Sequence, residues 1–173
     1  LTDDGFISLY PLLPYQIDLI ISVVSGLRTQ GGTSPHVGGA NRTIIKLAQQ
    51  LLINPQVRLA DKPLGDLVTL DQVYDLQVGN IASEVRAKIS AIPTSVPNAH
   101  PLAEPVAKVI CLLQFVKSVH RTPENIAACL HPGVAADSQL AGVKAAIEQL
   151  EAAHLVRSGD DGYRIPTPAE DDW

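Results

Sequence analysis

Residues 122–165 read TPENIAACLHPGVAADSQLAGVKAAIEQLEAAHLVRSGDDGYRI, and this stretch decides the C-terminal fold. Thr122 before a proline is typical of a helix start, because threonine caps backbone N–H groups and proline tolerates the first helical position. The pattern predicts a short helix through Leu130 and a longer helix over 138–153. Apolar residues on both sides of Gly-Asp-Asp-Gly then predict a β-hairpin over 155–165.

Upstream, apolar residues at helical intervals predict another helix over 102–119. Three helices followed by a β-hairpin make a winged helix-turn-helix, whose second and third helices form the helix-turn-helix pair. The order of these elements therefore predicts a winged helix-turn-helix as the C-terminal part of a mainly α protein.

The usual function of such a module is DNA binding, and the charges argue against it here. Residues 99–173 hold six Lys or Arg and ten Asp or Glu, so they carry −4 of the chain's net charge of −5. Phosphate contact needs several cations on one face. Lys144, Arg157 and Arg164 are the candidate contacts to nucleic acid or a partner, each with carboxylates close in sequence. The balance favours docking to another domain or a partner, with duplex DNA as the alternative.

The N-terminal half reads as helices separated by turns. An apolar helix is expected over 15–28, a glycine-rich loop over 31–39 and a second helix over 41–52. Asp71 is expected to cap a helix over 72–76, and Asn80 a helix over 81–92. Three prolines in residues 93–101 predict a break. The expected organisation is a helical domain (1–92), a Pro-rich linker (93–101), a winged-helix domain (102–166) and an acidic tail (167–173).

Gly39-Ala40-Asn41-Arg42 before an apolar helix resembles the sensor-2 segment in the helical lid of AAA+ ATPases. In that segment an arginine at the start of a lid helix reaches the γ-phosphate held by the ATPase core. The resemblance implies nucleotide sensing by Arg42, with Gly39 and Asn41 shaping the helix entry, and makes residues 1–92 a helical lid-like bundle. A glycine-rich turn before a solvated arginine is the alternative.

A longer string, from Tyr10-Pro11-Leu12-Leu13-Pro14-Tyr15-Gln16 through Leu52, is similar to the large P-loop ATPases of bacterial BREX and phage-growth-limitation defence systems (BrxC or PglY type). The segment Leu67 to Asp75 extends the likeness, which covers roughly residues 6–92. It implies a parent chain that binds ATP and Mg, an ATPase core of that chain as partner, and contact with other defence-system proteins.

The sequence contains no Gly-x-x-x-x-Gly-Lys-Ser/Thr, so the phosphate-binding loop of such an ATPase is missing from these residues. The chain also lacks Met, which leads us to expect a piece of something longer whose ATPase core precedes Leu1. We therefore expect the chain itself to be non-catalytic and to bind no cofactor alone. A free-standing winged-helix DNA-binding regulator with a helical dimerisation domain is the alternative.

Other chemistry has little support in the residues. His residues are scattered, and no His-Glu-x-x-His or Cys/His cluster predicts a metal. Cys111 and Cys129 lie among apolar neighbours and are expected to be buried thiols, which suits a reducing cytoplasm. No apolar run is long enough for a membrane span. A third hypothesis is a protein-interaction module in which the apolar face of Ile17–Leu27 docks the missing core or a partner.

Overall fold

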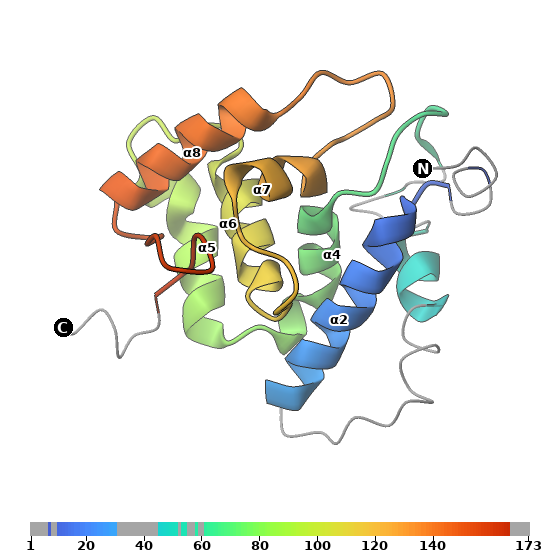
Figure 1. Cartoon of the computed structure of the whole chain (residues 1–173), viewed down its shortest axis with the longest axis horizontal. Helices are drawn as coiled ribbons and strands as arrows, with labels where there is room; N and C mark the ends of the chain where they lie inside the picture. The colour runs from blue at the N-terminus through green and yellow to red at the C-terminus, as the bar shows by residue number, and fades with distance from the viewer. Residues whose placement is uncertain are drawn as a thin grey trace.

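The structure is a computed structural model that describes residues 7, 10–30, 45–51, 53, 54, 58 and 61–166. It is mainly helical, which confirms the predicted class (Figure 1). Residues 45–51 are also helical, and a 3-10 turn covers Val78–Asn80. Within these ranges no helix is long and apolar enough to cross a membrane. The helices labelled in Figure 1 are α2 (Pro14–Gln30), α4 (Leu70–Gln77), α5 (Ser83–Ser95), α6 (Ala103–Leu113), α7 (Pro123–Cys129) and α8 (Leu140–Ala152).

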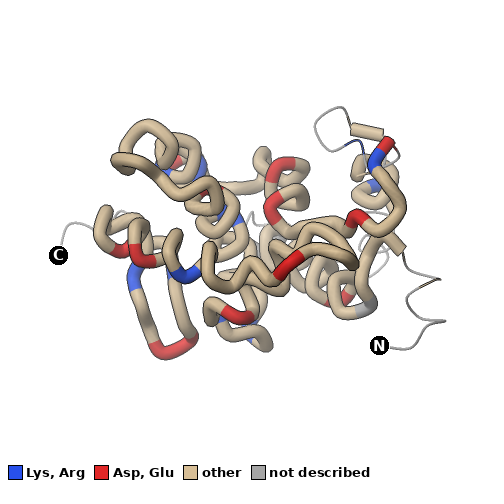
Figure 2. The backbone as a smooth tube through the Cα atoms, turned by 90° about the horizontal axis from the view of Figure 1, so that it is seen from above, with Lys and Arg blue, Asp and Glu red and all other residues tan. Residues whose placement is uncertain are grey.

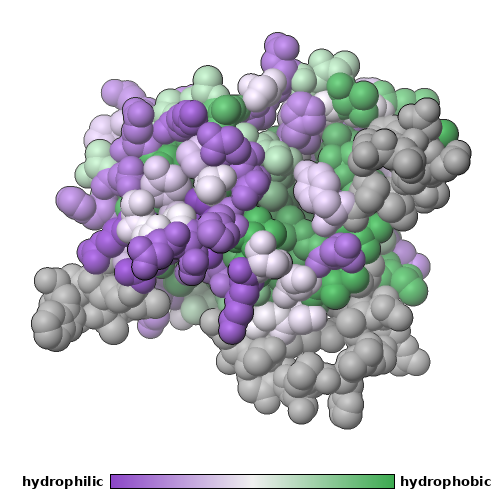
Figure 3. Space-filling view, in the orientation of Figure 1, coloured by the Kyte–Doolittle hydropathy of each residue, from purple (hydrophilic) through white to green (hydrophobic). Residues whose placement is uncertain are grey.

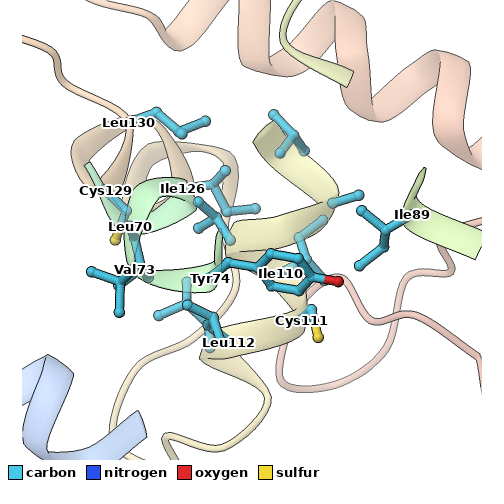
Figure 4. Close-up of a cluster of buried hydrophobic side chains, with 14 of the residues drawn as sticks. Leu70, Val73, Tyr74, Ile89, Ile110, Cys111, Leu112, Ile126, Cys129 and Leu130 are labelled. Atoms are coloured by element: carbon cyan, nitrogen blue, oxygen red, sulfur yellow. The ribbon is translucent and has the colours of Figure 1, made fainter. Parts of the chain in front are cut away.

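Helix α6 lies at the centre of the core. Its sequence AEPVAKVICLL leaves so little polar surface that eight of its 11 residues are buried, as expected of a helix that is apolar nearly all round. It packs against α4, α5, α7 and α8, and Figure 4 shows its side chains meeting those of Leu70, Val73 and Tyr74 from α4. One buried cluster extends from Leu19 in α2 to Ile165 after the C-terminal turn.

The sequence predicted that the prolines of 93–101 would end α5 at Ile92, and this prediction is wrong. Pro93 lies inside the helix, which continues to Ser95. Only two residues follow the proline, so the helix loses one backbone donor in its last turn, where the cost is smaller than in mid-helix. Beyond it, Val96 N–H still donates to Ile92 at 3.0 Å. The hydrophobic core is continuous across the predicted linker.

Three other predicted helix ends are wrong. Helix α4 begins at Leu70, and its N-cap is Thr69. The Thr69 backbone N–H donates to Oε1 of Gln72 in a capping box, so Asp71 lies in the first turn. Helix α5 begins at Ser83, with Ala82 and not Asn80 at the N-cap. Helix α6 ends at Leu113, short of the predicted 119.

The apolar face of α2 is not available for docking. Leu19, Ile20, Val23, Val24 and Leu27 are all buried in the core of this same chain. Ile17 and Ile21 are half-buried. The five buried side chains do not form the docking face that the sequence suggested, because they already pack within this chain.

The predicted β-hairpin is not confirmed as a pair of strands. Among the described residues the structure has isolated β-bridges and no strand. Arg157 and Arg164 face each other in an antiparallel bridge, with N–H···O distances of 2.9 Å in both directions. We call the segment Arg157–Arg164 the C-terminal turn. Short arms of this kind are held by what they pack on, since a two-stranded ribbon alone is marginal.

Both cysteines are expected to resist alkylation in the folded protein. Cys111 and Cys129 are buried, and burial raises the pKa of each thiol to about 12, so the reactive thiolate is scarce at neutral pH. Iodoacetamide at pH 8, followed by mass spectrometry, should modify both thiols rapidly in denaturant and only slowly without it. Rapid labelling of the native chain would contradict this packing.

Asp71 is expected to destabilise the protein at neutral pH. Its Oδ1 is buried without a hydrogen-bond partner in the described structure. Burial raises the pKa of this carboxyl, and the Thr69 hydrogen bond only partly offsets that effect. The carboxyl lies near Lys108, which forms ion pairs with Asp75 at 2.8 Å and Glu104 at 3.0 Å.

A folded-state pKa above the unfolded value of about 3.9 means that the unfolding free energy falls as pH rises past that value. Asp71→Asn should therefore raise the urea midpoint at pH 7 and leave it nearly unchanged at pH 3. Asp160→Asn, at the exposed tip of the C-terminal turn, is the control and should shift neither midpoint. Equal effects of Asp71→Asn at both pH values would contradict the assignment.

Candidate interaction surface

The start of α7 follows the sequence prediction closely. Thr122 is the N-cap, and its side chain accepts a hydrogen bond from Asn125 N–H at 3.3 Å. Pro123 takes the first helical position, where no backbone donor is lost. This cap fixes Glu124 on the surface beside α8. Ten residues, 130–139, separate α7 from α8.

Lys144 is ion-paired with Glu124 across the two helices. The Nζ–Oε1 distance is 3.6 Å, and the two side chains are 53% and 61% exposed. A pair this exposed adds little to stability, because water and salt screen it. The pair has a larger effect on DNA binding, because the Glu124 carboxylate cancels much of the attraction between Lys144 and a phosphate.

Carboxylates dominate the rest of this surface. Glu148 is exposed and Glu151 half-buried on α8. Partial burial raises the pKa of Tyr163, and the negative charges of Glu151, Glu148 and Glu124 raise it further. Three carboxylates from two helices therefore act on the phenol of the C-terminal turn. We call Glu124, Glu148, Glu151 and Tyr163 the acidic face.

Arg157 and Arg164 do come together, as the hairpin pattern predicted. Each donates its backbone N–H to the other's carbonyl, and Gly159 and Gly162 are paired the same way at 3.1 and 3.0 Å. Figure 2 shows acidic residues at the tip of the turn and basic residues on its two arms. The three predicted contact residues therefore lie in two places. Arg157 and Arg164 are both in the C-terminal turn, whereas Lys144 lies on α8 and is ion-paired with Glu124.

Sequence reasoning missed Lys117 and Arg121. A parallel bridge joins Arg121 to Gly162, Arg121 N–H donates to the Asp161 carbonyl at 2.9 Å, and Arg121 Nε donates to the Tyr163 carbonyl at 2.6 Å. Lys117 and Arg121 line a hollow that Arg164 also borders. No signal in the sequence could have linked them to the turn, because the residues lie about 40 positions apart and belong to no motif.

A second hollow, of about 250 Å³, lies between α2 and α7. The Tyr15 hydroxyl spans the two helices by donating to the Ala128 carbonyl at 3.1 Å. Cys129 at its wall is a buried thiol with a pKa raised to about 12, and Tyr15 has its pKa raised to about 12 as well. Neither group is an activated nucleophile at neutral pH.

Figure 3 shows hydrophobic surface gathered on the α2 side and hydrophilic side chains on the side of α8 and the C-terminal turn.

The predicted nucleotide-sensing residues Gly39, Asn41 and Arg42 lie outside the described residues, as does the acidic tail. In the described part of the chain, no three His, Cys, Asp or Glu side chains are grouped so that they could hold a metal ion. No protein-family model matches the chain, and no solved structure matches it.

Proposed function

We propose that this chain is a non-catalytic region of a P-loop ATPase, of the class that serves bacterial antiphage defence. A helical lid-like part contributes nucleotide sensing, and a winged helix docks to another domain or to a partner protein. The observation that carries the docking role is the acidic face of α7, α8 and the C-terminal turn.

The acidic face suits a protein partner better than it suits DNA. Glu124, Glu148 and Glu151 would repel phosphates at the helix that a winged helix ordinarily inserts into the major groove. The other exposed side chains of α8, apart from Lys144, are Ala141, Ala145 and Ala152. Alanine offers no hydrogen-bond donor or acceptor to base edges, so α8 itself has little with which to read a sequence.

The order of elements supports the winged-helix assignment. Helix α6 is followed by the Arg121 bridge, α7, α8 and the C-terminal turn, and the turn closes back on Arg121. The ten-residue connection between α7 and α8 departs from the usual turn of about 3–4 residues. It is tied down instead by hydrogen bonds from Leu67 to Pro132 and from Val134 to Gly65, of 2.9 and 2.8 Å.

The nucleotide-sensing role rests on the resemblance of Gly39 to Arg42 to a sensor-2 segment, with ATP and Mg held by the core of the parent protein. In the product of the complete reading frame, Arg42→Ala should lower ATP turnover at least tenfold, because a guanidinium contact to a transferring phosphate is worth several kcal/mol. Lys46→Ala, an exposed cation nearby in sequence, is the matched control. Unchanged turnover in Arg42→Ala would remove this role, and a full-length product without ATPase activity would remove the proposed family.

A free-standing DNA-binding regulator is the second candidate, favoured by the same bridges that support the winged helix. The genomic reading frame separates the two. An in-frame Gly-x-x-x-x-Gly-Lys-Ser/Thr upstream agrees with the ATPase, whereas a start codon directly before Leu1 agrees with the regulator.

A further inference from the structure

The hollow at the base of the C-terminal turn has an unusual charge for this acidic chain. It is about 390 Å³ in volume, and among the described residues its lining consists of Gln114, Lys117, Val119, Arg121, Asp161 and Arg164. These described lining residues supply three cations and one carboxylate, although the whole chain carries −5. A concave site lined by one sign of charge concentrates the field and attracts the opposite ion.

Hydrogen bonds hold two of the lining side chains in position. The Arg121 guanidinium is oriented by the bond from Nε to the Tyr163 carbonyl at 2.6 Å. Gln114 accepts a hydrogen bond from the backbone N–H of Ile165 on its Oε1 at 3.0 Å, and its NH₂ group is a donor. Side chains fixed in this way lose less entropy when a ligand binds.

The lining is therefore rich in donors and poor in acceptors. Arginine forks and lysine ammonium groups match the tetrahedral oxygens of phosphate, and the Gln114 amide adds a neutral donor. From this geometry we propose that the hollow binds a phosphate group, supplied either by a free phosphate compound or by the backbone of a nucleic acid. The site is separate from the acidic face, and it does not depend on the proposed function.

The test uses the chain as it is, with pyrophosphate as the probe in calorimetric titration at low ionic strength. Lys117→Gln and Arg164→Gln should each weaken binding at least fivefold. Asp161→Asn should tighten binding severalfold, a gain that loss of folding could not produce. Lys144→Gln removes the same charge from α8 and should leave the affinity within twofold of the unaltered chain.

Two further arms identify the source of the phosphate. If a 12-nucleotide single strand without terminal phosphates displaces pyrophosphate and shows the same pattern of variants, the ligand is a nucleic-acid backbone. If it does not displace pyrophosphate, the ligand is a free phosphate compound, and both results support the site. No binding of pyrophosphate at 10 mM, equal weakening by Lys144→Gln, or binding of polyglutamate in place of pyrophosphate would overturn the proposal.

Discussion

Ile110→Ala should lower the free energy of unfolding by about 2–5 kcal/mol, because it removes a large side chain from a site that cannot refill. Ile110 is 0% exposed and lies in α6, the helix on which α4, α5, α7 and α8 all pack. Figure 4 shows it beside Tyr74, whose ring extends from α4 across α6. Calorimetry should show one transition, with the midpoint lowered by about 2–4 °C for each kcal/mol lost.

Ile45→Ala is the matched control, since the Ile45 side chain is 61% exposed and lies in the helical stretch 45–51. That substitution should change the unfolding free energy by less than about 0.5 kcal/mol. If Ile110→Ala and Ile45→Ala cost the same, α6 is not the centre of the core. Two separate transitions in the unaltered chain would mean that the predicted linker at 93–101 does divide it.

Gly162→Ala should damage the C-terminal turn and its contact with Arg121. Gly162 has a φ of +94°, and a Cβ at this position would meet the backbone of Arg121, including its carbonyl carbon at 2.6 Å. The left-handed conformation costs about 1–2 kcal/mol, and forcing the overlap costs about 1–3 kcal/mol more. The midpoint in urea should fall accordingly, and pyrophosphate binding should weaken because Arg121 and Arg164 no longer hold their places.

Gly159→Ala makes the same chemical change in the same turn. Its added Cβ would lie 3.6 Å from the Gly162 carbonyl oxygen, an ordinary contact, so stability and binding should stay close to those of the unaltered chain. Equal stability of Gly162→Ala and Gly159→Ala would show that the bridge from Arg121 to the turn does not form.

Local signals predicted the parts of the fold that local chemistry decides. Thr122 before proline gave the correct start of α7. The Gly-Asp-Asp-Gly pattern predicted a hairpin over 155–165, where the structure has an isolated bridge between Arg157 and Arg164 and no strands. Thr69 was overlooked as a cap because Asp71 is also a good capping residue, and only the Gln72 side chain selects between them.

Contacts between distant segments left no such signal. The Pro93 pattern reads as a break, yet packing of Ile89 and Ile92 in the core holds the helix to Ser95. Neither the pairing of Lys144 with Glu124 nor the hollow that joins Lys117 to Arg164 follows from spacing, because each joins residues from different elements. The balance of charge over residues 99–173 agrees with the three carboxylates that raise the pKa of Tyr163.

We propose that the acidic face of α7 and α8 does not read DNA. Fluorescence anisotropy of this chain with two labelled duplexes of unrelated sequence, titrated at several salt concentrations, measures this directly. We expect affinities equal within twofold for the two duplexes, and no change on Lys144→Ala. Binding that prefers one duplex by tenfold or more and is lost in Lys144→Ala would instead establish α8 as a recognition helix.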